Sequence, residues 1–136
     1  MTNPTPGFVK HPNYLVAIEP LESPLQVTVG TTVIATSHRA VCVTETKHRP
    51  VWYMPLDDIQ ANLITPTDTQ TYCPFKGKAS YWSVVLPETT IEDAIWAYLE
   101  PYDECVALAG YASFYTNKVD LLINGQVMNK DGPGFV

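Results

Sequence analysis

Apolar and polar residues alternate in short runs along most of the chain, a pattern typical of half-buried β-strands. The runs lie at residues 25–29, 32–37, 40–45 and 50–55, and again at 69–73, 79–85, 112–115 and 119–123. Gly30-Thr31 separates the first two runs and predicts a hairpin. Asn124-Gly125 predicts a tight turn into a last short strand at 126–128. We expect the first four runs to form an antiparallel meander.

Helical patterns are few and short. Residues 56–63 read as one short helix, with Asp57 and Asp58 suited to cap its positive end. Residues 91–100 fit both a helix and a strand, and residues 103–108 form a weak helical turn. The pattern therefore predicts a mainly β protein with one or two short helices, arranged as a small twisted antiparallel barrel or sandwich.

The length of 136 residues suits a single domain. Residues 1–24 contain five prolines and predict an extended arm that wraps the domain or stays loose. The β-rich domain is expected at 25–128. Residues 129–136 include Gly132-Pro133-Gly134 and predict an irregular tail.

The net charge of −6, with no basic cluster beyond Lys47-His48-Arg49, disfavours nucleic acid and anionic membranes as partners. No apolar run approaches the roughly 18 residues of a membrane helix, and no secretory signal is visible, so cytoplasm is the expected location. Three cysteines without a Cys-x-x-Cys pair indicate reduced thiols, and the histidine spacing predicts no metal site. Nothing in the sequence identifies a cofactor.

The segment from Tyr72 to Trp82 is the strongest candidate for a site. Pro74 and Gly77 predict a tight loop that brings Cys73 and Lys76 close together. A cation near a thiol favours the reactive thiolate, so Cys73 could act as a nucleophile while Lys76 supports it or binds an anion. The alternative is that Cys73 is a small buried hydrophobe and Lys76 a surface charge.

Glu45 is a candidate general base. It shares a strand face with Val41 and Val43, so it points inward if those two face the core. The alternative is that the strand has ended and Glu45 is solvated. Arg39 could pair with Glu45 or bind an anion, unless it is a plain turn residue.

Twelve of the fifteen aromatic residues lie between Trp52 and Tyr115. A cleft for a planar or apolar ligand could be lined by Tyr53, Tyr72, Tyr81, Trp82, Trp96 and Tyr98. The alternative is an aromatic core of the kind common in small β-domains.

Taken with their spacing, several motifs resemble the domain of unknown function 427 family. They are Ser37-His38-Arg39-Ala40 before Glu45, Pro50-Val51-Trp52-Tyr53-Met54-Pro55 with Asp58, Cys73-Pro74-Phe75-Lys76-Gly77 with Ala79 and Tyr81, Ala94-Ile95-Trp96-Ala97-Tyr98, and Gly110 with Phe114 and Tyr115. The resemblance spans about residues 27–123. It implies a twisted, mainly β fold with an Mss4-like outline, a strand at 94–98, and the label nucleotidyltransferase-like.

Three hypotheses follow for the function. In the first, the chain binds a small anionic or aromatic ligand in a pocket beside the loop, lined by Glu45, Tyr53, Cys73, Lys76, Tyr81 and Trp96, with Arg39 or Lys76 holding an anionic group. In the second, it is a structural or interaction domain in which Lys76 and Glu45 form an internal ion bridge. The third is nucleotidyl transfer, which normally needs carboxylates that hold magnesium. Residues 1–24 could also dock a second copy to give a homodimer.

Overall fold

The computed structural model describes residues 15–46 and 49–128 of the chain, and within these ranges it contains strands and 3₁₀ turns but no α-helix. The strands are β1 (Val16–Pro20), β2 (Leu25–Val29), β3 (Thr32–Ser37), β4 (Val41–Glu45), β5 (Val51–Pro55), β6 (Ile64–Cys73), β7 (Gly77–Val85), β8 (Thr90–Ala97), β9 (Tyr111–Phe114), β10 (Asp120–Ile123) and β11 (Gln126–Val127). The 3₁₀ turns are η1 (Leu56–Asp58), η2 (Ala61–Leu63) and η3 (Asp103–Leu108). The prediction of a mainly β protein is confirmed.

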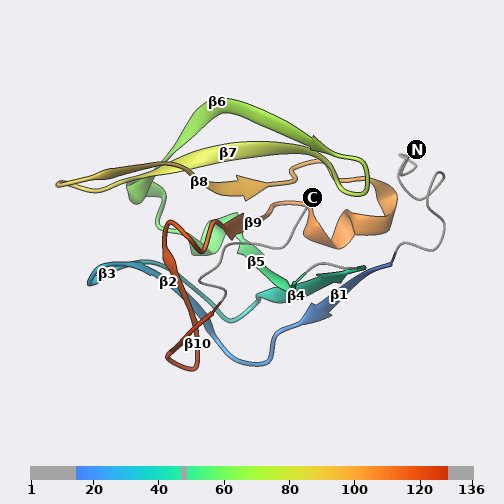
Figure 1. The fold of residues 1–136 in the computed structure, drawn as a ribbon, viewed down its shortest axis with the longest axis horizontal. Coiled ribbons are helices and arrows are strands. Elements are labelled where there is room, and N and C mark those ends of the chain that lie inside the picture. The colour runs from blue at the N-terminus through green and yellow to red at the C-terminus, as the bar shows by residue number, and fades with distance from the viewer. Residues whose placement is uncertain (1–14, 47–48, 129–136) are drawn as a thin grey trace.

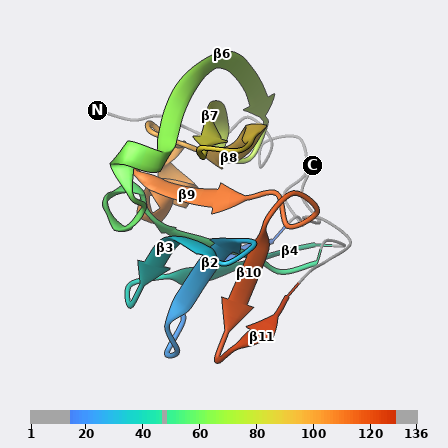
Figure 2. The same ribbon diagram turned by 90° about the vertical axis from the view of Figure 1, so that its left-hand side faces the viewer.

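The strands form two antiparallel sheets (Figures 1 and 2). The larger sheet has seven strands in the order β1-β4-β5-β9-β8-β7-β6, and the smaller has four in the order β11-β10-β2-β3. Both sheets are open in the part of the chain that the structure describes, so the closed barrel that was one expected alternative is not observed there. The Mss4-like outline stays a prediction.

Two local predictions are wrong. The expected meander divides after β3, because β3 pairs with β2 in the smaller sheet while β4 pairs with β1 and β5 in the larger one. The expected helix at 56–63 is two separate 3₁₀ turns, and Ile59 between them is extended and forms an isolated bridge with Ala35. The bridge between Ile59 and Ala35 of β3 thus takes the place of a continuous helix at 56–63.

Both faces of the larger sheet are buried at its centre, as β5 shows most clearly. Trp52 and Met54 pack into a core shared with residues of the smaller sheet such as Val27 and Leu121. Tyr53, between them on the opposite face, belongs to a second, more aromatic core. A strand that is covered on both faces needs apolar residues at every position, not only at alternate ones. This explains the continuous apolar sequence Val-Trp-Tyr-Met-Pro of β5.

The second core lies under the loop between β6 and β7 and under η3. From the loop it takes Phe75, and from η3 it takes Cys105 and Leu108. Two hydrogen bonds join the loop to η3 and the residue before it. The Tyr102 amide donates to the Lys76 carbonyl at 3.0 Å, and the Cys105 thiol donates to the Phe75 carbonyl at 3.6 Å. These contacts hold the loop against η3 and the residue that precedes it.

The folded sheet starts before residue 25, where the sequence analysis placed the domain boundary. Val16–Pro20 pairs with β4 over five residues, from Val16 opposite Glu45 to Pro20 opposite Val41. Residues 1–14 and the predicted tail at 129–136 lie outside the described residues. No helix of the described residues is long and apolar enough to span a membrane.

Replacement of Gly77 by alanine tests the loop geometry. Gly77 has φ of +115°, which L side chains rarely adopt, whereas an added Cβ would meet its nearest neighbour, the Glu100 carbonyl oxygen, at an ordinary 3.5 Å. The cost is therefore conformational, and we expect Gly77→Ala to lower the free energy of unfolding by about 1–3 kcal/mol in urea denaturation. Gly30→Ala, at φ +59° with open space around it, should cost less. Equal stability of Gly77→Ala and wild type would contradict this explanation.

Candidate functional site

Lys76 and Glu45 form a buried ion pair. Glu45 is the last residue of β4, and Lys76 lies in the loop before β7. The Lys76 ammonium donates a hydrogen bond to Glu45 Oε1, and the two residues are 0% and 8% exposed. The expected inward orientation of Glu45 and the hypothesis of an internal ion bridge are both confirmed, and the alternative that Lys76 is a surface charge is wrong.

Tyr53 and Tyr98 lie close enough to this pair to respond to the Glu45 charge. Burial raises the pKa of both hydroxyls well above the ordinary value, and the Glu45 carboxylate raises each pKa further. The Tyr53 hydroxyl accepts a hydrogen bond from Trp96 Nε1 at 3.2 Å. Both tyrosines therefore stay neutral at physiological pH and add polar groups to the core without adding charge.

Cys73 is also enclosed. It is 2% exposed and belongs to the same buried cluster as Tyr53 and Tyr98. Burial in an aromatic cluster agrees with the view of Cys73 as a small buried hydrophobe. Its role as a nucleophile stays a prediction.

Tyr81 and Trp96, the other predicted ligand contacts, are buried in the aromatic core. The Tyr81 hydroxyl bonds to Thr71 Oγ1 at 2.8 Å and to the Tyr115 hydroxyl at 3.2 Å. The Trp96 ring packs on Tyr115 with ring centroids 4.6 Å apart. The structure thus brings Tyr53, Tyr81 and Trp96 together as core residues, and contact with a ligand stays a prediction for all three.

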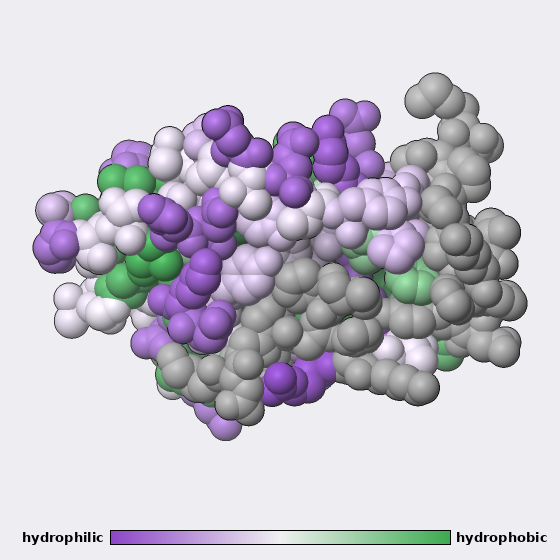
Figure 3. Space-filling view, turned by 45° about the horizontal axis from the view of Figure 1, so that its top comes forward, coloured by the Kyte–Doolittle hydropathy of each residue, from purple (hydrophilic) through white to green (hydrophobic). Residues whose placement is uncertain are grey.

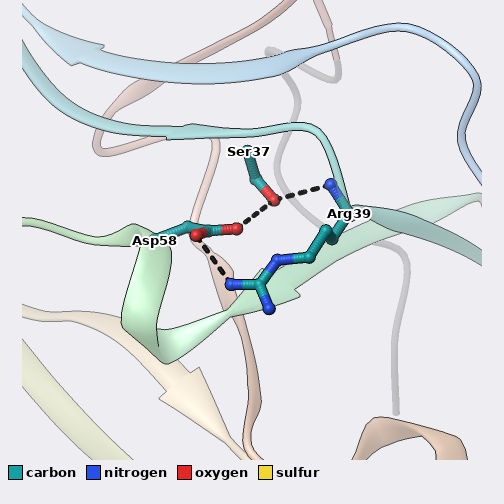
Figure 4. A network of polar contacts seen from close by, with 3 residues as sticks. All are labelled: Ser37, Arg39 and Asp58. Carbon is teal, nitrogen blue, oxygen red and sulfur yellow. Dashed lines mark hydrogen bonds and ion pairs between the residues drawn. The ribbon is translucent and has the colours of Figure 1, made fainter.

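Arg39 lies elsewhere and pairs with a different carboxylate. Its guanidinium bonds to Asp58 Oδ1 at 2.8 Å, while the Ser37 hydroxyl donates to Asp58 Oδ2 at 2.5 Å and accepts from the Arg39 amide at 3.0 Å (Figure 4). The expectation that Arg39 could pair with Glu45 is wrong. Asp58 does not cap a helix either, because its carboxylate binds Ser37 and Arg39 and makes no cap to η1. Sequence reasoning missed this network because nothing local indicates that β3 meets η1.

The network changes the acidity of its charged members. The hydrogen bond and charge of Asp58 raise the pKa of Arg39. The pKa of Asp58 is lowered, first by the Arg39 hydrogen bond and then by the Ser37 hydroxyl, although partial burial opposes them. The carboxylate form of Asp58 is thus favoured by folding.

Three surface hollows formed by described residues lie away from the buried ion pair. Their volumes are about 160, 310 and 310 Å³. The smallest is lined by Pro24, Gln26, Thr36, Leu122, Asn124 and Gly125. None of the three is lined by Cys73, Lys76 or Glu45.

One of the larger hollows is rich in hydroxyls. It is lined by Thr65, Thr67, Thr69, Ser83, Thr90, Glu92 and Asp93. The Asp93 carboxylate already accepts hydrogen bonds from Thr67 and Thr69, each at 2.6 Å, and these bonds lower its pKa. The acceptor at the centre of this hollow is therefore satisfied by the protein itself.

The other larger hollow lies beside the Gly77 turn and is lined by Lys78, Ser80, Leu99 and Glu100. Lys78 and Ser80 lie within the segment from Tyr72 to Trp82 that was predicted to form a site, but neither was an individual candidate, and Leu99 and Glu100 lie outside it. The alternation along β7 places Lys78 and Ser80 on one face, but the contribution of residues 99 and 100 depends on how β8 ends. Among the described residues, no group of three or more His, Cys, Asp or Glu side chains is placed to hold a metal ion.

Hydrophobic side chains on the surface are scattered. The face in Figure 3 is mostly hydrophilic or neutral, and its hydrophobic residues form small separate areas. The exposed large hydrophobic residues come from several different elements: Leu15, Val33, Tyr72, Val85, Leu99, Val106 and Val127. Such scattered residues are ordinary on soluble domains and do not define a docking surface.

Acid titration of Asp58→Asn tests the Arg39 network. Because folding lowers the Asp58 pKa, its contribution to stability is fully present above the unfolded value of about 3.9 and is lost as pH falls through the folded pKa. We expect Asp58→Asn to be less stable than wild type at pH 5–7 and the difference to shrink below about pH 4. Urea denaturation of both proteins from pH 7 down to below pH 4 measures this difference in the free energy of unfolding. Asp57→Asn, a neighbouring exposed carboxylate, is the control, and a difference independent of pH would contradict the network's role.

The sequence matches the family model described as Domain of unknown function (DUF427) over residues 17–125. No curated protein matches the chain. The match runs from β1 to the turn after β10 and includes both partners of the buried ion pair and the whole Arg39 network. It covers most of the 136 residues. The chain therefore belongs to the DUF427 family.

Proposed function

We propose that this chain is an interaction domain: a rigid β scaffold whose shape is held by the Lys76–Glu45 ion pair and whose ligands bind at its surface. The observation that carries the proposal is the burial of that pair. The three residues predicted to be catalytic, Cys73, Lys76 and Glu45, are each less than 9% exposed.

The position of the ion pair in the sheet supports a structural role. In the larger sheet, β5, β9 and β8 lie between β4, which carries Glu45, and β7, which follows Lys76. The pair thus connects two parts of the sheet that share no backbone hydrogen bonds. Such a bridge favours the curved arrangement of the sheet over flatter alternatives.

The energetics of burial point the same way. A buried ammonium and a buried carboxylate are tolerated because each satisfies the other, and an anionic ligand at Lys76 would have to displace Glu45. Displacement would leave the carboxylate without this partner in an apolar core. Binding at the surface avoids that cost.

Two other functions stay predictions. Direct ligand binding by Tyr53, Lys76, Tyr81 or Trp96 requires these buried side chains to become accessible, whereas Arg39 is exposed and already paired with Asp58. Nucleotidyl transfer rests on the family label, and calorimetry with ATP and magnesium would test it.

Lys76→Met tests the structural role of the ion pair. The substitution keeps much of the side-chain volume but leaves the buried Glu45 carboxylate without its ammonium partner. We expect it to lower the free energy of unfolding by about 3–5 kcal/mol, measured in guanidinium chloride.

The matched control is Lys78→Met, which removes an exposed lysine two residues away. This variant should remain within about 0.5 kcal/mol of wild type. If Lys76→Met were as stable as Lys78→Met, the ion pair would not hold the scaffold and the proposal would fail.

A further inference from the structure

The hollow beside the Gly77 turn has an unusual combination of side chains. Its lining contains one cation, one carboxylate, one hydroxyl and one aliphatic group, supplied by Lys78, Glu100, Ser80 and Leu99. Its volume of about 310 Å³ lies at the lower end of the range for small-molecule sites. The lining therefore suits a small ligand with several kinds of polar group.

The two charged side chains do not neutralise each other. Among the described residues, no hydrogen bond or ion pair joins the side chain of Lys78 or Glu100 to another group, although both border the same hollow. Two opposite charges that face a shared space without pairing leave room for a molecule that pairs with both. The hydroxyl-rich hollow around Asp93 has no such pair of opposite charges among the described residues that line it, and Thr67 and Thr69 already donate hydrogen bonds to the Asp93 carboxylate.

We infer that this hollow binds a zwitterionic small molecule, an α-amino acid with an apolar side chain. Its carboxylate pairs with the Lys78 ammonium and accepts from the Ser80 hydroxyl, and its ammonium pairs with the Glu100 carboxylate. Simple anions are disfavoured by Glu100, and simple cations are disfavoured by Lys78. The site goes beyond the proposed function, since it names a surface and a ligand class.

An apolar ligand side chain has a surface to contact. Leu99 is 47% exposed at the hollow. Tyr72 lies directly opposite Lys78 in the β6–β7 ladder, so the two side chains share a face of the sheet, and its ring is 59% exposed. The Tyr72 hydroxyl bonds to that of Tyr102 at 2.6 Å, which holds the ring in place.

The backbone around the hollow is fixed by contacts already described. Gly77 lies against the carbonyl oxygen of Glu100, and the Tyr102 amide bonds to the Lys76 carbonyl. These contacts join the start of β7 to residues 100–102. The backbone that carries the two charged residues is therefore held in place before any ligand arrives, which reduces the entropy cost of binding.

Titration of the full chain with L-leucine, followed by two-dimensional NMR of the backbone amides, tests the inference. We expect saturable shifts at residues 78–80 and 99–100 with a dissociation constant on the order of a millimolar, because exposed ion pairs bind weakly. The probes 3-methylbutylamine and 4-methylpentanoate, which lack the carboxylate and the ammonium group respectively, should bind more weakly by up to about fivefold.

Lys78→Met and Glu100→Gln should each weaken leucine binding to a similar extent while the chain stays folded. Glu88→Gln, an exposed carboxylate in the turn between β7 and β8, should bind like wild type. Equal binding of leucine and its two analogues, shifts that map to another surface, or no shifts well above millimolar leucine would each overturn the inference. These outcomes are independent of the stability of Lys76→Met, so the two proposals can fail separately.

Discussion

The fold of this protein depends on one buried electrostatic contact, the hydrogen-bonded ion pair between Lys76 and Glu45. The pair lies on the face of the larger sheet that is covered by the β6–β7 loop and η3, and it joins β4 to the loop before β7, although three strands separate β4 from β7. Ladder hydrogen bonds connect only neighbouring strands, so they leave the curvature of a wide sheet weakly determined. A charge pair across the face supplies the missing constraint, because each partner is costly to bury alone.

The aromatic core completes this arrangement. Tyr53 packs edge-on against Trp96 with ring centroids 6.0 Å apart, and Tyr98 lies 6.5 Å from Tyr53. Large rings fill the space between the curved sheet and the loop, while their hydroxyl and indole groups satisfy one another. The residues that first suggest a binding cleft thus explain how a charged pair is accommodated in the interior. The surface site that we propose uses Lys78, near the start of β7, and Glu100, just beyond the end of β8.

Local sequence signals predicted the local features well. The hairpin of β2 and β3, the return at Asn124-Gly125 and the inward direction of Glu45 all follow from alternation and turn residues, and the structure confirms them. The family resemblance correctly favoured a strand for Ala94–Tyr98, whose pattern alone was ambiguous, since β8 runs to Ala97. The burial of Lys76 could be predicted only as a hypothesis, because a lysine next to glycine is usually a surface residue.

Features that depend on distant contacts could not be predicted. The alternation in Thr32–Ser37 and Val41–Glu45 does not reveal that these two strands belong to different sheets, β3 pairing with β2 and β4 with β1 and β5, so the sequence predicted a single meander. Asp58 looks like a helix cap in the sequence because it stands at the start of a helical pattern. Its actual partners, Ser37 and Arg39, lie at and just after the end of β3 and cannot be recognised from the local sequence. The hollow at Lys78 and Glu100 likewise forms only when the end of β8 reaches the start of β7.

The most direct test of the central claim is a double-mutant cycle on the ion pair, with Lys76→Met, Glu45→Leu and the combined variant compared by chemical denaturation. If the two charges stabilise the curved sheet as a pair, the single substitutions are far from additive, with a coupling free energy of about 3 kcal/mol, and the double variant recovers much of the stability that each single variant loses. Additive losses within about 0.5 kcal/mol would show that Lys76 and Glu45 act independently, and would contradict the account.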